Sequence, residues 1–343
     1  MEQWKQDRLI DILDTLIDYR GKTPNKVECG IPLITAKIVK NGRIETPTEF
    51  LTVEDYKDWM VRGYPQMGDV VITTEAPLGE VAQLRDDKIA LAQRIVCLRG
   101  KEGVLDNTYL KYFLMSNIGQ YRLKARETGT TVTGIKQSEL KEVLIDYPNY
   151  ELQQKIASIL SSFDSKIELN RRINDNLEQQ AQALFKAWFV DNAVIGDASV
   201  SDYFIPLRGK NLLTSDAKGG EVPVVAGGLT PSAYHNVANT KAPVITISAS
   251  GANAGYVNLW GIPVWSADSS YIDSSITPHI YFWYNLLKFS QKNIFDSQTG
   301  SAQPHIYPKH IGDIRIPDLD LDKVADYNKI VTPIYEQITN TKR

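Results

Sequence analysis

Residues 151–190 read ELQQKIASILSSFDSKIELNRRINDNLEQQAQALFKAWFV. Alternating steps of four and three residues connect a candidate seam made of Ile156, Leu160, Phe163, Ile167, Asn170, Asn174, Leu177, Ala181, Leu184 and Trp188. This spacing is typical of a coiled coil, in which a buried Asn fixes register and partner orientation at a cost in stability. The stretch therefore predicts one helix, a rod on the order of 60 Å long at about 1.5 Å per residue. The alternative is a single amphipathic helix lying on one domain.

An internal repeat surrounds this helix. The segment 128–145 begins with TGTT and continues with isoleucine, leucine and valine, and the segment 299–316 begins with TGSA and continues in the same pattern. The offset is 171 throughout, and it continues into the helical segments, where 156–167 aligns with 327–338. A repeat of this length predicts two related domains, each followed by a helix.

Three segments farther upstream also recur, at other offsets. RGK at 20–22 recurs at 208–210, IPLI at 31–34 pairs with VPVV at 222–225, and DVVIT at 69–73 pairs with PVITI at 243–247. The changing offsets indicate loop insertions between the two copies.

Each half mixes strand and helix signals. Short apolar runs at 70–73, 95–98, 224–225 and 244–247 predict strands. Residues 107–124 predict a helix capped by Asn107 or Thr108, and 278–292 is its expected counterpart. The predicted fold class is α+β: two related α/β domains, each with a compact, partly curled sheet, separated by long helices.

Length and composition limit the function. A chain of 343 residues is too long for one ordinary core. A net charge of -3 and a pI of about 5.9 argue against a free DNA binder, so a DNA partner would require a local basic patch or a second subunit. The charged N-terminus, the short apolar runs and only two cysteines predict a cytoplasmic protein with no signal peptide and no membrane partner.

No catalytic motif that we considered is complete in this sequence. Gly21-Lys22-Thr23 resembles the end of a P-loop, but Leu16 occupies the position of its first glycine. His235, His279, His305 and His310 form no helical metal pair, so no metal site is predicted. Carboxylates are scattered, and no acid/base pair stands out. We therefore expect no catalytic residue on this chain.

Two polar loops suit DNA. The stretch 120–136 combines four cations with a Thr/Gly tip, and 298–303 repeats the Thr/Gly-Ser tip with flanking glutamines. Hydroxyl and backbone donors suit phosphate oxygens, and Asn or Gln can read base edges. An ordinary exposed loop is the alternative. The candidate DNA-binding residues are Arg20, Lys22, Lys37, Thr73, Thr74, Arg94, Arg122, Lys124, Arg126, Thr130, Thr131, Lys136, Arg208, Lys210, Ser248, Ser250, Asn253, Ser301, Gln303 and His305.

Four short stretches carry a resemblance to a known family. They are IDYP at 145–148, QQKIA at 153–157, DSKIELNRRIN at 164–174 and ALFKAWF at 183–189. Together with the repeat they make the chain resemble the specificity subunit of type I restriction-modification systems. The resemblance extends over essentially the whole chain.

The resemblance implies a domain plan and a function. Target-recognition domain 1 would occupy 1–150, the conserved spacer helix 151–193, target-recognition domain 2 194–320, and a short distal helix 321–343. Three explanations of the short helix stay open: a truncation, a natural short form, or an allele from a rearranging locus. The helices would pack antiparallel and fix the gap of a split, asymmetric DNA site, with one domain reading each half in the major groove.

The resemblance also implies partners. Two modification subunits that carry S-adenosylmethionine would dock on the chain and methylate adenine in double-stranded DNA. Restriction subunits would add ATP- and Mg-dependent cleavage. No cofactor is expected on this chain, which would be a non-catalytic subunit.

The chain departs from the family in its second helix, which begins near Asp322 and lacks a counterpart of 169–189. This departure puts in doubt the full pairing of the two helices and the docking of one modification subunit. Two other classes stay open: a coiled-coil scaffold that presents two protein-binding domains, and a two-domain enzyme with unrecognised carboxylates. DNA binding that weakens steeply with salt would favour the specificity subunit.

Overall fold

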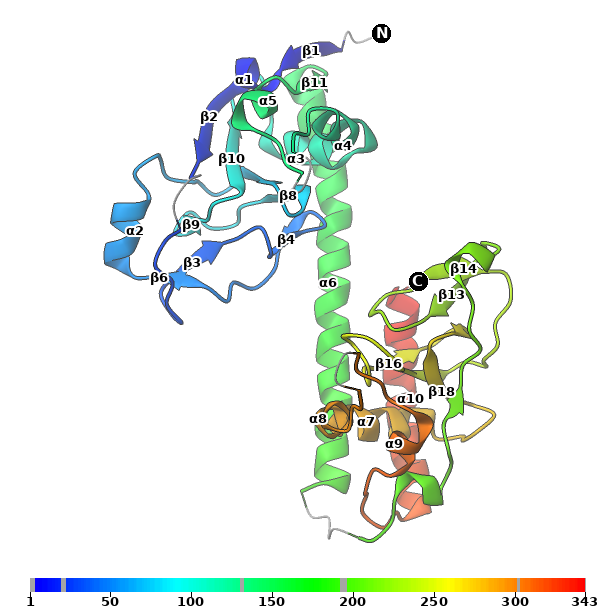
Figure 1. The fold of residues 1–343 in the computed structure, drawn as a ribbon. Coiled ribbons are helices and arrows are strands. Elements are labelled where there is room, and N and C mark those ends of the chain that lie inside the picture. The colour runs from blue at the N-terminus through cyan, green and yellow to red at the C-terminus, as the bar shows by residue number, and fades with distance from the viewer. Residues whose placement is uncertain (1–3, 20–22, 130–132, 192–195, 301–302, 343) are drawn as a thin grey trace. The chain divides into compact units, whose positions relative to one another are not determined.

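The computed structural model describes residues 4–19, 23–129, 133–191, 196–300 and 303–342. The chain divides into two compact units, residues 1–167 and 168–343, with the division inside helix α6 (Tyr150–Phe189). Each unit is shown in Figure 1. The four-segment plan derived from the sequence stays a prediction, although the long helix was expected within one residue of both its ends.

Unit 1 is built on a four-stranded sheet in the order β2-β10-β7-β8. Its strands are β2 (Leu13–Asp18), β7 (Val70–Thr74), β8 (Leu78–Gln83) and β10 (Ile95–Gly100). Every residue of β7 is buried because both faces of this sheet are covered. A strand buried on both sides has a continuous apolar sequence rather than an alternating one, as 70–73 does.

Helices cover one face of this sheet, and smaller sheets cover the other. The helical face is formed by α1 (Leu9–Ile12), α3 (Asn107–Met115), α4 (Asn117–Lys124), α5 (Gln137–Lys141) and the start of α6. The opposite face carries β3 (Ile31–Ile34), β6 (Phe50–Leu51) and β9 (Ala90–Leu91), with α2 (Val53–Trp59) and the hairpin β4 (Val39–Lys40) and β5 (Arg43–Ile44). Strands β1 (Lys5–Arg8) and β11 (Leu144–Tyr147) pair separately.

Unit 2 repeats this plan. Its four-stranded sheet has the order β12-β18-β15-β16, and its smaller sheet β14-β13-β17 joins one antiparallel and one parallel pair, as β6-β3-β9 does. The strands are β12 (Leu207–Arg208), β13 (Val222–Val225), β14 (Ala233–His235), β15 (Val244–Ser248), β16 (Val257–Trp260), β17 (Trp265–Ser266) and β18 (Ser269–Asp273). The predicted repeat is confirmed.

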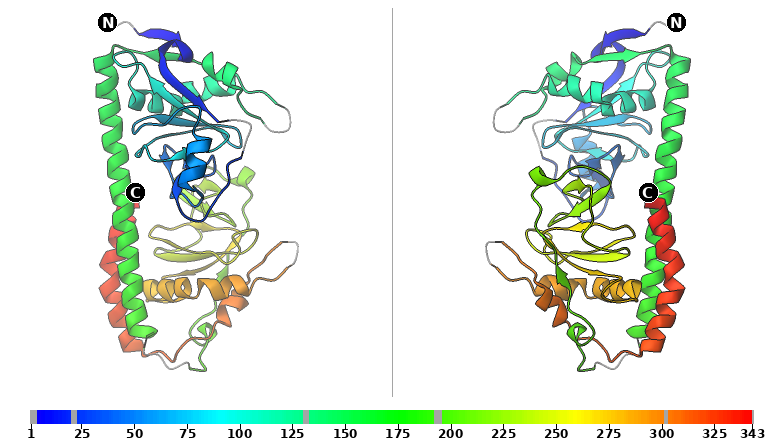
Figure 2. Two further views of the ribbon diagram at one scale, coloured as in Figure 1. Left: turned by 90° about the vertical axis from the view of Figure 1, so that its left-hand side faces the viewer. Right: turned by 90° about the vertical axis from the view of Figure 1, so that its right-hand side faces the viewer.

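The helices of unit 2 are η1 (Val200–Asp202), η2 (Thr214–Asp216), α7 (Ile280–Phe289), α8 (Gln291–Asp296), α9 (Pro308–Gly312) and α10 (Leu321–Lys342). They follow the order of those in unit 1, except that among the described residues η2 has no helical counterpart in unit 1 and α2 has none in unit 2. Helix α10 begins 171 residues after α6. It runs antiparallel to the second half of α6, because Lys323 bonds to Trp188 while Thr341 bonds to Asn174. Figure 2 shows this helix pair.

The structure differs from the sequence-based expectation at the predicted helix 107–124. Two helices replace it, because the backbone of Ser116 is extended and its hydroxyl accepts from the Gly119 amide, which caps α4. A side chain at Gly119 would lie 2.1 Å from the Phe113 carbonyl oxygen, so the two helices pack at a point that admits only glycine. The first cap is Asp106 rather than Asn107 or Thr108. The expected helix 278–292 is likewise two helices, α7 and α8.

Candidate nucleic-acid interface

Several of the predicted residues lie at one end of the large sheet in unit 1, where β7 ends and β10 begins. We call this end of the sheet the edge of unit 1. Here β7 ends at Thr74, whose amide donates to the Arg94 carbonyl at 2.9 Å, and the Thr74 carbonyl accepts from the Ile135 amide at 2.9 Å. The loop after α4 closes through the bridge between Thr128 and Gly134. A side chain at Gly134 would lie 2.8 Å from the Thr74 carbonyl oxygen, so glycine permits this close approach.

Unit 2 builds the same edge. The Ala249 amide donates to the Asp268 carbonyl at 3.1 Å, and the Ala249 carbonyl accepts from the Ile306 amide at 2.9 Å. Thr299 bridges His305, as Thr128 bridges Gly134, and Ser250 also bridges His305, as Glu75 bridges Gly134. The two edges are therefore equivalent residue by residue: Thr74 corresponds to Ala249, Glu75 to Ser250, and Arg94 to Asp268.

This equivalence corrects the sequence pairing of β7 with β15. The sequence aligned 69–73 with 243–247, an offset of 174, whereas the hydrogen bonds give 175. The burial of the side chains agrees, because Val70 and Ile72 face the helices, as Ile245 and Ile247 do, while Val244 faces the other side. Side chains alternate along a strand, so a slip of one residue exchanges the two faces.

A charged pair lies at each edge. In unit 1 the Nε atom of Arg94 is 2.6 Å from Oε1 of Glu75. In unit 2 a terminal nitrogen of Arg208 is 2.6 Å from Oδ1 of Asp268, whose other oxygen accepts from the Ser250 hydroxyl. All four charged side chains are at least one third exposed. The edges therefore present both a cation and an acceptor to a ligand.

Several predicted residues present exposed side chains. Lys136 is the N-cap residue of α5, Lys124 ends α4, Lys37 follows β3, and both Lys210 and Gln303 are exposed in unit 2. The backbone of Lys210 is fixed to Ser266 and Trp265, so its ammonium group extends from an ordered segment. His305 and Asn253 are half-buried, and the Asn253 amide donates weakly to the Gly227 carbonyl at 3.5 Å. Their role as DNA contacts stays a prediction.

Three other predicted residues are buried. Thr73, Thr74 and Ser248 are at most 5% exposed. The Thr73 hydroxyl donates to the Pro77 carbonyl and accepts from the Glu80 amide, and the Ser248 hydroxyl donates to the Gly227 carbonyl. Buried hydroxyls are satisfied mostly by internal partners, so these three residues shape the edge in this structure, and direct DNA contact by them stays a prediction.

Two predicted arginines have partners inside unit 1. Arg122 donates to the Leu144 carbonyl at 2.7 Å and to the Asp146 carboxylate at 2.8 Å, with only 22% of its side chain exposed. Arg126 pairs with Glu139 at 3.0 Å. The basic stretch therefore offers DNA less positive charge than its sequence indicates. Arg20, Lys22, Thr130, Thr131 and Ser301 lie outside the described residues.

The predicted seam divides into two parts. From Asn174 onward its residues pack in unit 2, where Asn174 accepts from the Thr341 hydroxyl at 2.6 Å and Leu177, Ala181, Leu184 and Trp188 join the core around α10. Ile156 packs on the helical core of unit 1, but Leu160, Phe163 and Ile167 are 37%, 60% and 56% exposed, and Asn170 is half-buried. The C-terminal half thus forms the expected antiparallel helix contact.

Sequence reasoning missed Glu75 and Asp268. Glu75 directly follows the apolar run of β7, a signal that could have identified it, whereas Asp268 lies between Ser266-Ala267 and Ser269-Ser270 and has no such signal. Their arginine partners are 19 and 60 residues distant in sequence, so the ion pairs themselves could not be inferred.

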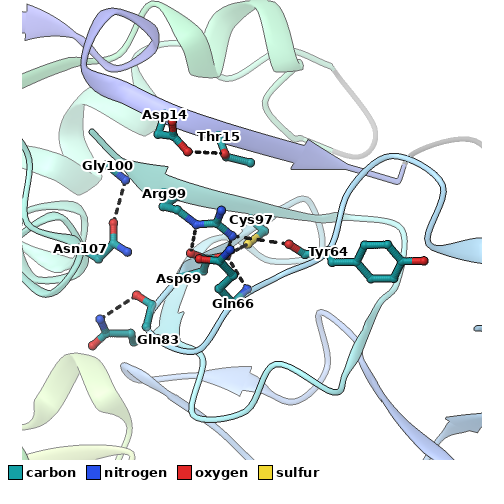
Figure 3. Close-up of polar contacts among 11 residues, drawn as sticks. Asp14, Thr15, Tyr64, Gln66, Asp69, Gln83, Cys97, Arg99, Gly100 and Asn107 are labelled. Carbon is teal, nitrogen blue, oxygen red and sulfur yellow. Dashed lines mark hydrogen bonds and ion pairs between the residues drawn. The ribbon is translucent and has the colours of Figure 1, made fainter. Parts of the chain in front are cut away.

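The opposite end of the large sheet in unit 1 holds a buried ion pair. Asp69, which is 1% exposed, accepts from two nitrogens of Arg99 at 2.7 Å each and from the Gln66 amide. The Cys97 thiol lies 3.4 Å from the same carboxylate, and Figure 3 shows these side chains together. Burial, and then the nearby Asp69 carboxylate, raise the pKa of the Cys97 thiol well above its usual value. This cluster anchors the loop before β7 and is distant from the candidate interface.

No helix in the described part of the chain is long and apolar enough to cross a membrane. Among the same residues, no group of three or more His, Cys, Asp or Glu side chains could hold a metal ion.

Comparisons with known proteins agree on one family. A family model described as the type I restriction modification DNA specificity domain matches residues 1–179. The MjaIX type I restriction enzyme specificity subunit of Methanocaldococcus jannaschii is 26% identical over all of this chain and 89% of its own length. The HindI specificity subunit of Haemophilus influenzae is 30% identical over 45% of this chain and 35% of its own length. The crystal structure of a type I restriction-modification S subunit from M. genitalium has the same fold, with a TM-score of 0.57 at 21% identity, covering 99% of this chain and 91% of that one.

Proposed function

The chain belongs to the type I restriction modification DNA specificity family, and from this premise we propose that each of its two units reads one half of a split, asymmetric double-stranded DNA site. The observation that carries the proposal is the recurrence of one polar sheet edge in both units, with equivalent hydrogen bonds at Thr74 and Ala249. A reader of two half-sites needs two such edges on one chain.

The edge has the parts that DNA recognition requires. Exposed lysines, such as Lys136 in unit 1 and Lys210 in unit 2, supply contacts to phosphate that carry affinity. Side chains fixed on strand ends supply hydrogen bonds to base edges in the major groove. Because the chain is acidic overall, partner subunits supply the remaining positive surface around the DNA.

The proposal extends to the assembly. Two modification subunits dock on this chain, bind S-adenosylmethionine and methylate adenine, and restriction subunits add cleavage with ATP and Mg. This chain supplies specificity and no catalytic group, and it acts where the DNA is, in the cytoplasm. The family match favours this function over a coiled-coil scaffold.

The test is co-expression with the modification subunit of the same operon, followed by genome-wide mapping of methylated adenines. A single split motif with a fixed gap, appearing only when this chain is present, is the expected result. Co-purification without methylation would contradict the proposal that this chain directs modification, and failure of the subunits to associate would favour the scaffold. Binding of the complex to its site should weaken steeply as salt rises from about 50 to 200 mM, because phosphate contacts release counterions.

A further inference from the structure

Equivalent positions at the two edges carry different side chains. Glu75 in unit 1 corresponds to Ser250 in unit 2, and Arg94 corresponds to Asp268. The surrounding frame is shared, including the hydrogen bonds of Thr74 and Ala249 and the bridges formed by Thr128 and Thr299. Two units that share this backbone arrangement but bind different half-sites must differ in the side chains that contact bases, because phosphate contacts carry no sequence information. Of these two positions, the one occupied by Arg94 and Asp268 reverses its charge while the surrounding hydrogen bonds are kept, which is what different base reading in the two half-sites requires.

The backbone holds Arg94 in an unusual way. Its φ is 74°, a left-handed conformation that costs energy in any residue except glycine. The Arg94 carbonyl accepts a hydrogen bond from the Thr74 amide, and the next residue, Ile95, begins β10. The Arg94 side chain therefore projects from a rigid strand end. Backbone strain kept at an exposed arginine indicates that the orientation of its side chain serves a function.

The ion pair of Arg94 is compatible with base reading. Glu75 Oε1 lies 2.6 Å from Nε of Arg94, whereas a bidentate contact with guanine O6 and N7 can be made by the two terminal nitrogens. The arginine side chain is 51% exposed and Glu75 is 37% exposed, so the pair is worth little in stability. Glu75 therefore acts as a positioning residue that orients the guanidinium group.

Asp268 has the complementary arrangement. Arg208 contacts one carboxylate oxygen and the Ser250 hydroxyl contacts the other. Each carboxylate oxygen has two acceptor sites, so both can accept a further donor while these contacts persist. A carboxylate in this position suits the N4 amino group of cytosine.

We infer that Arg94 and Asp268 are the specificity-determining residues of the two edges, with Arg94 reading a guanine in one half-site and Asp268 reading a cytosine in the other. This inference rests on the proposed function. Glu75, together with Arg208 and Ser250, orients the reading groups.

The experiment uses the complex with its modification subunits. Arg94→Gln, Arg94→Lys and Asp268→Asn are compared with two exposed controls: Arg85→Gln, which follows β8 at the other end of the sheet, and Asp322→Asn on α10. Methylated adenines are mapped for each, and the affinity for the duplex carrying the unaltered motif is measured as a function of salt.

Arg94→Gln and Arg94→Lys should change or relax one letter in one half of the motif only, and Asp268→Asn one letter in the other half only. Affinity for the original duplex should fall about tenfold to a hundredfold with an unchanged salt slope, because each change removes a base contact and no phosphate contact. The controls should leave motif and affinity unchanged. Arg94→Lys keeps the charge but lacks the planar fork, so its failure separates base reading from simple attraction.

An unchanged motif in the Arg94 and Asp268 variants would overturn the assignment. Uniform loss of methylation in both halves with a shallower salt slope would overturn it as well, because that pattern is produced by phosphate contacts. Absence of any motif with the unaltered chain would instead overturn the proposed function and, with it, this assignment. Co-purification and thermal unfolding verify that each variant is folded.

Discussion

Arg122 and Lys124 are two residues apart on α4, and the structure gives them different roles. Arg122 is mostly buried and bonds to Leu144 and Asp146, whereas Lys124 is exposed. Arg122→Ala should lower the free energy of unfolding by about 1–3 kcal/mol, since it leaves a carbonyl and a carboxylate without a charged donor. Lys124→Ala should change it by less than about 0.5 kcal/mol. Chemical denaturation of the two variants measures both values, and equal losses would contradict the structure.

Asp146 makes unit 1 sensitive to acid. Burial alone would raise the pKa of its carboxyl group, but hydrogen bonds from Arg122 and Gln6 outweigh burial and lower the pKa. A lowered folded-state pKa adds stability that is complete above the usual Asp value of about 3.9 and is lost as pH falls through the folded-state pKa. Asp146→Asn should therefore lose less stability than the unaltered chain as pH falls from about 5 to about 2, a range that begins just above the unfolded-state pKa and extends below it. Thermal unfolding at several pH values tests this, and identical pH profiles would refute it.

The two cysteines should differ in reactivity. Cys29 is exposed, while Cys97 is buried, and burial with the Asp69 carboxylate raises its pKa. Thiolate is the reactive form, so alkylation of the native protein near pH 8 should label Cys29 and spare Cys97. Mass spectrometry locates the label, and denatured protein, labelled at both residues, is the control. Rapid labelling of Cys97 in the native state would show that the Asp69 cluster opens.

At the element scale, α10 is held by tyrosines whose hydroxyls have different partners. The Tyr335 hydroxyl donates to the Asn285 side-chain oxygen, which is buried, and the Tyr327 hydroxyl donates to the Ala181 carbonyl within α6. Tyr335→Phe should cost about 1–3 kcal/mol, because it leaves a buried amide oxygen without its donor. Tyr327→Phe should cost about 0.5–1.5 kcal/mol, because a helical carbonyl keeps its backbone bond. Thermal unfolding of the matched pair tests this order, and the reverse order would contradict it.

Elements were predicted well from the sequence where the deciding interactions are local. The seam of α6 repeats from Ile156 to Trp188, and the ends of the helix were expected within one residue. The break at Ser116 was not predicted, because the apolar pattern of 107–124 continues through it and the deciding contact is a side-chain cap beside a glycine. The register of β15 was one residue in error, since apolar runs buried on both faces lack the alternation that fixes register. The ion pairs of Arg94 and Arg208 form between segments whose proximity only the fold establishes.

At the scale of the whole molecule, α6 is one uninterrupted helix that contributes to both units. If the units read two half-sites, the length of this helix should set the gap between them. Insertion of seven helix-forming residues between Ile167 and Glu168 lengthens the helix by about 10 Å and nearly restores its facing direction. The gap in the methylated motif should grow by about three base pairs, at 3.4 Å per step.

A matched insertion in the exposed segment after β8, next to Arg85, serves as the control and should leave the gap unchanged. Mapping of methylated adenines reads both outcomes. A gap that stays the same after the α6 insertion would show that the helix does not act as the spacer.

The exposed apolar residues of α6 have a consequence for handling the protein. Leu160, Phe163 and Ile167 follow one another at steps of three and four with more than a third of each side chain exposed. A continuous apolar stripe in water promotes self-association. Purified alone, the chain should therefore self-associate and give a polydisperse size distribution in light scattering. Producing it together with its modification subunits is then preferable to reconstituting the assembly from separately purified subunits.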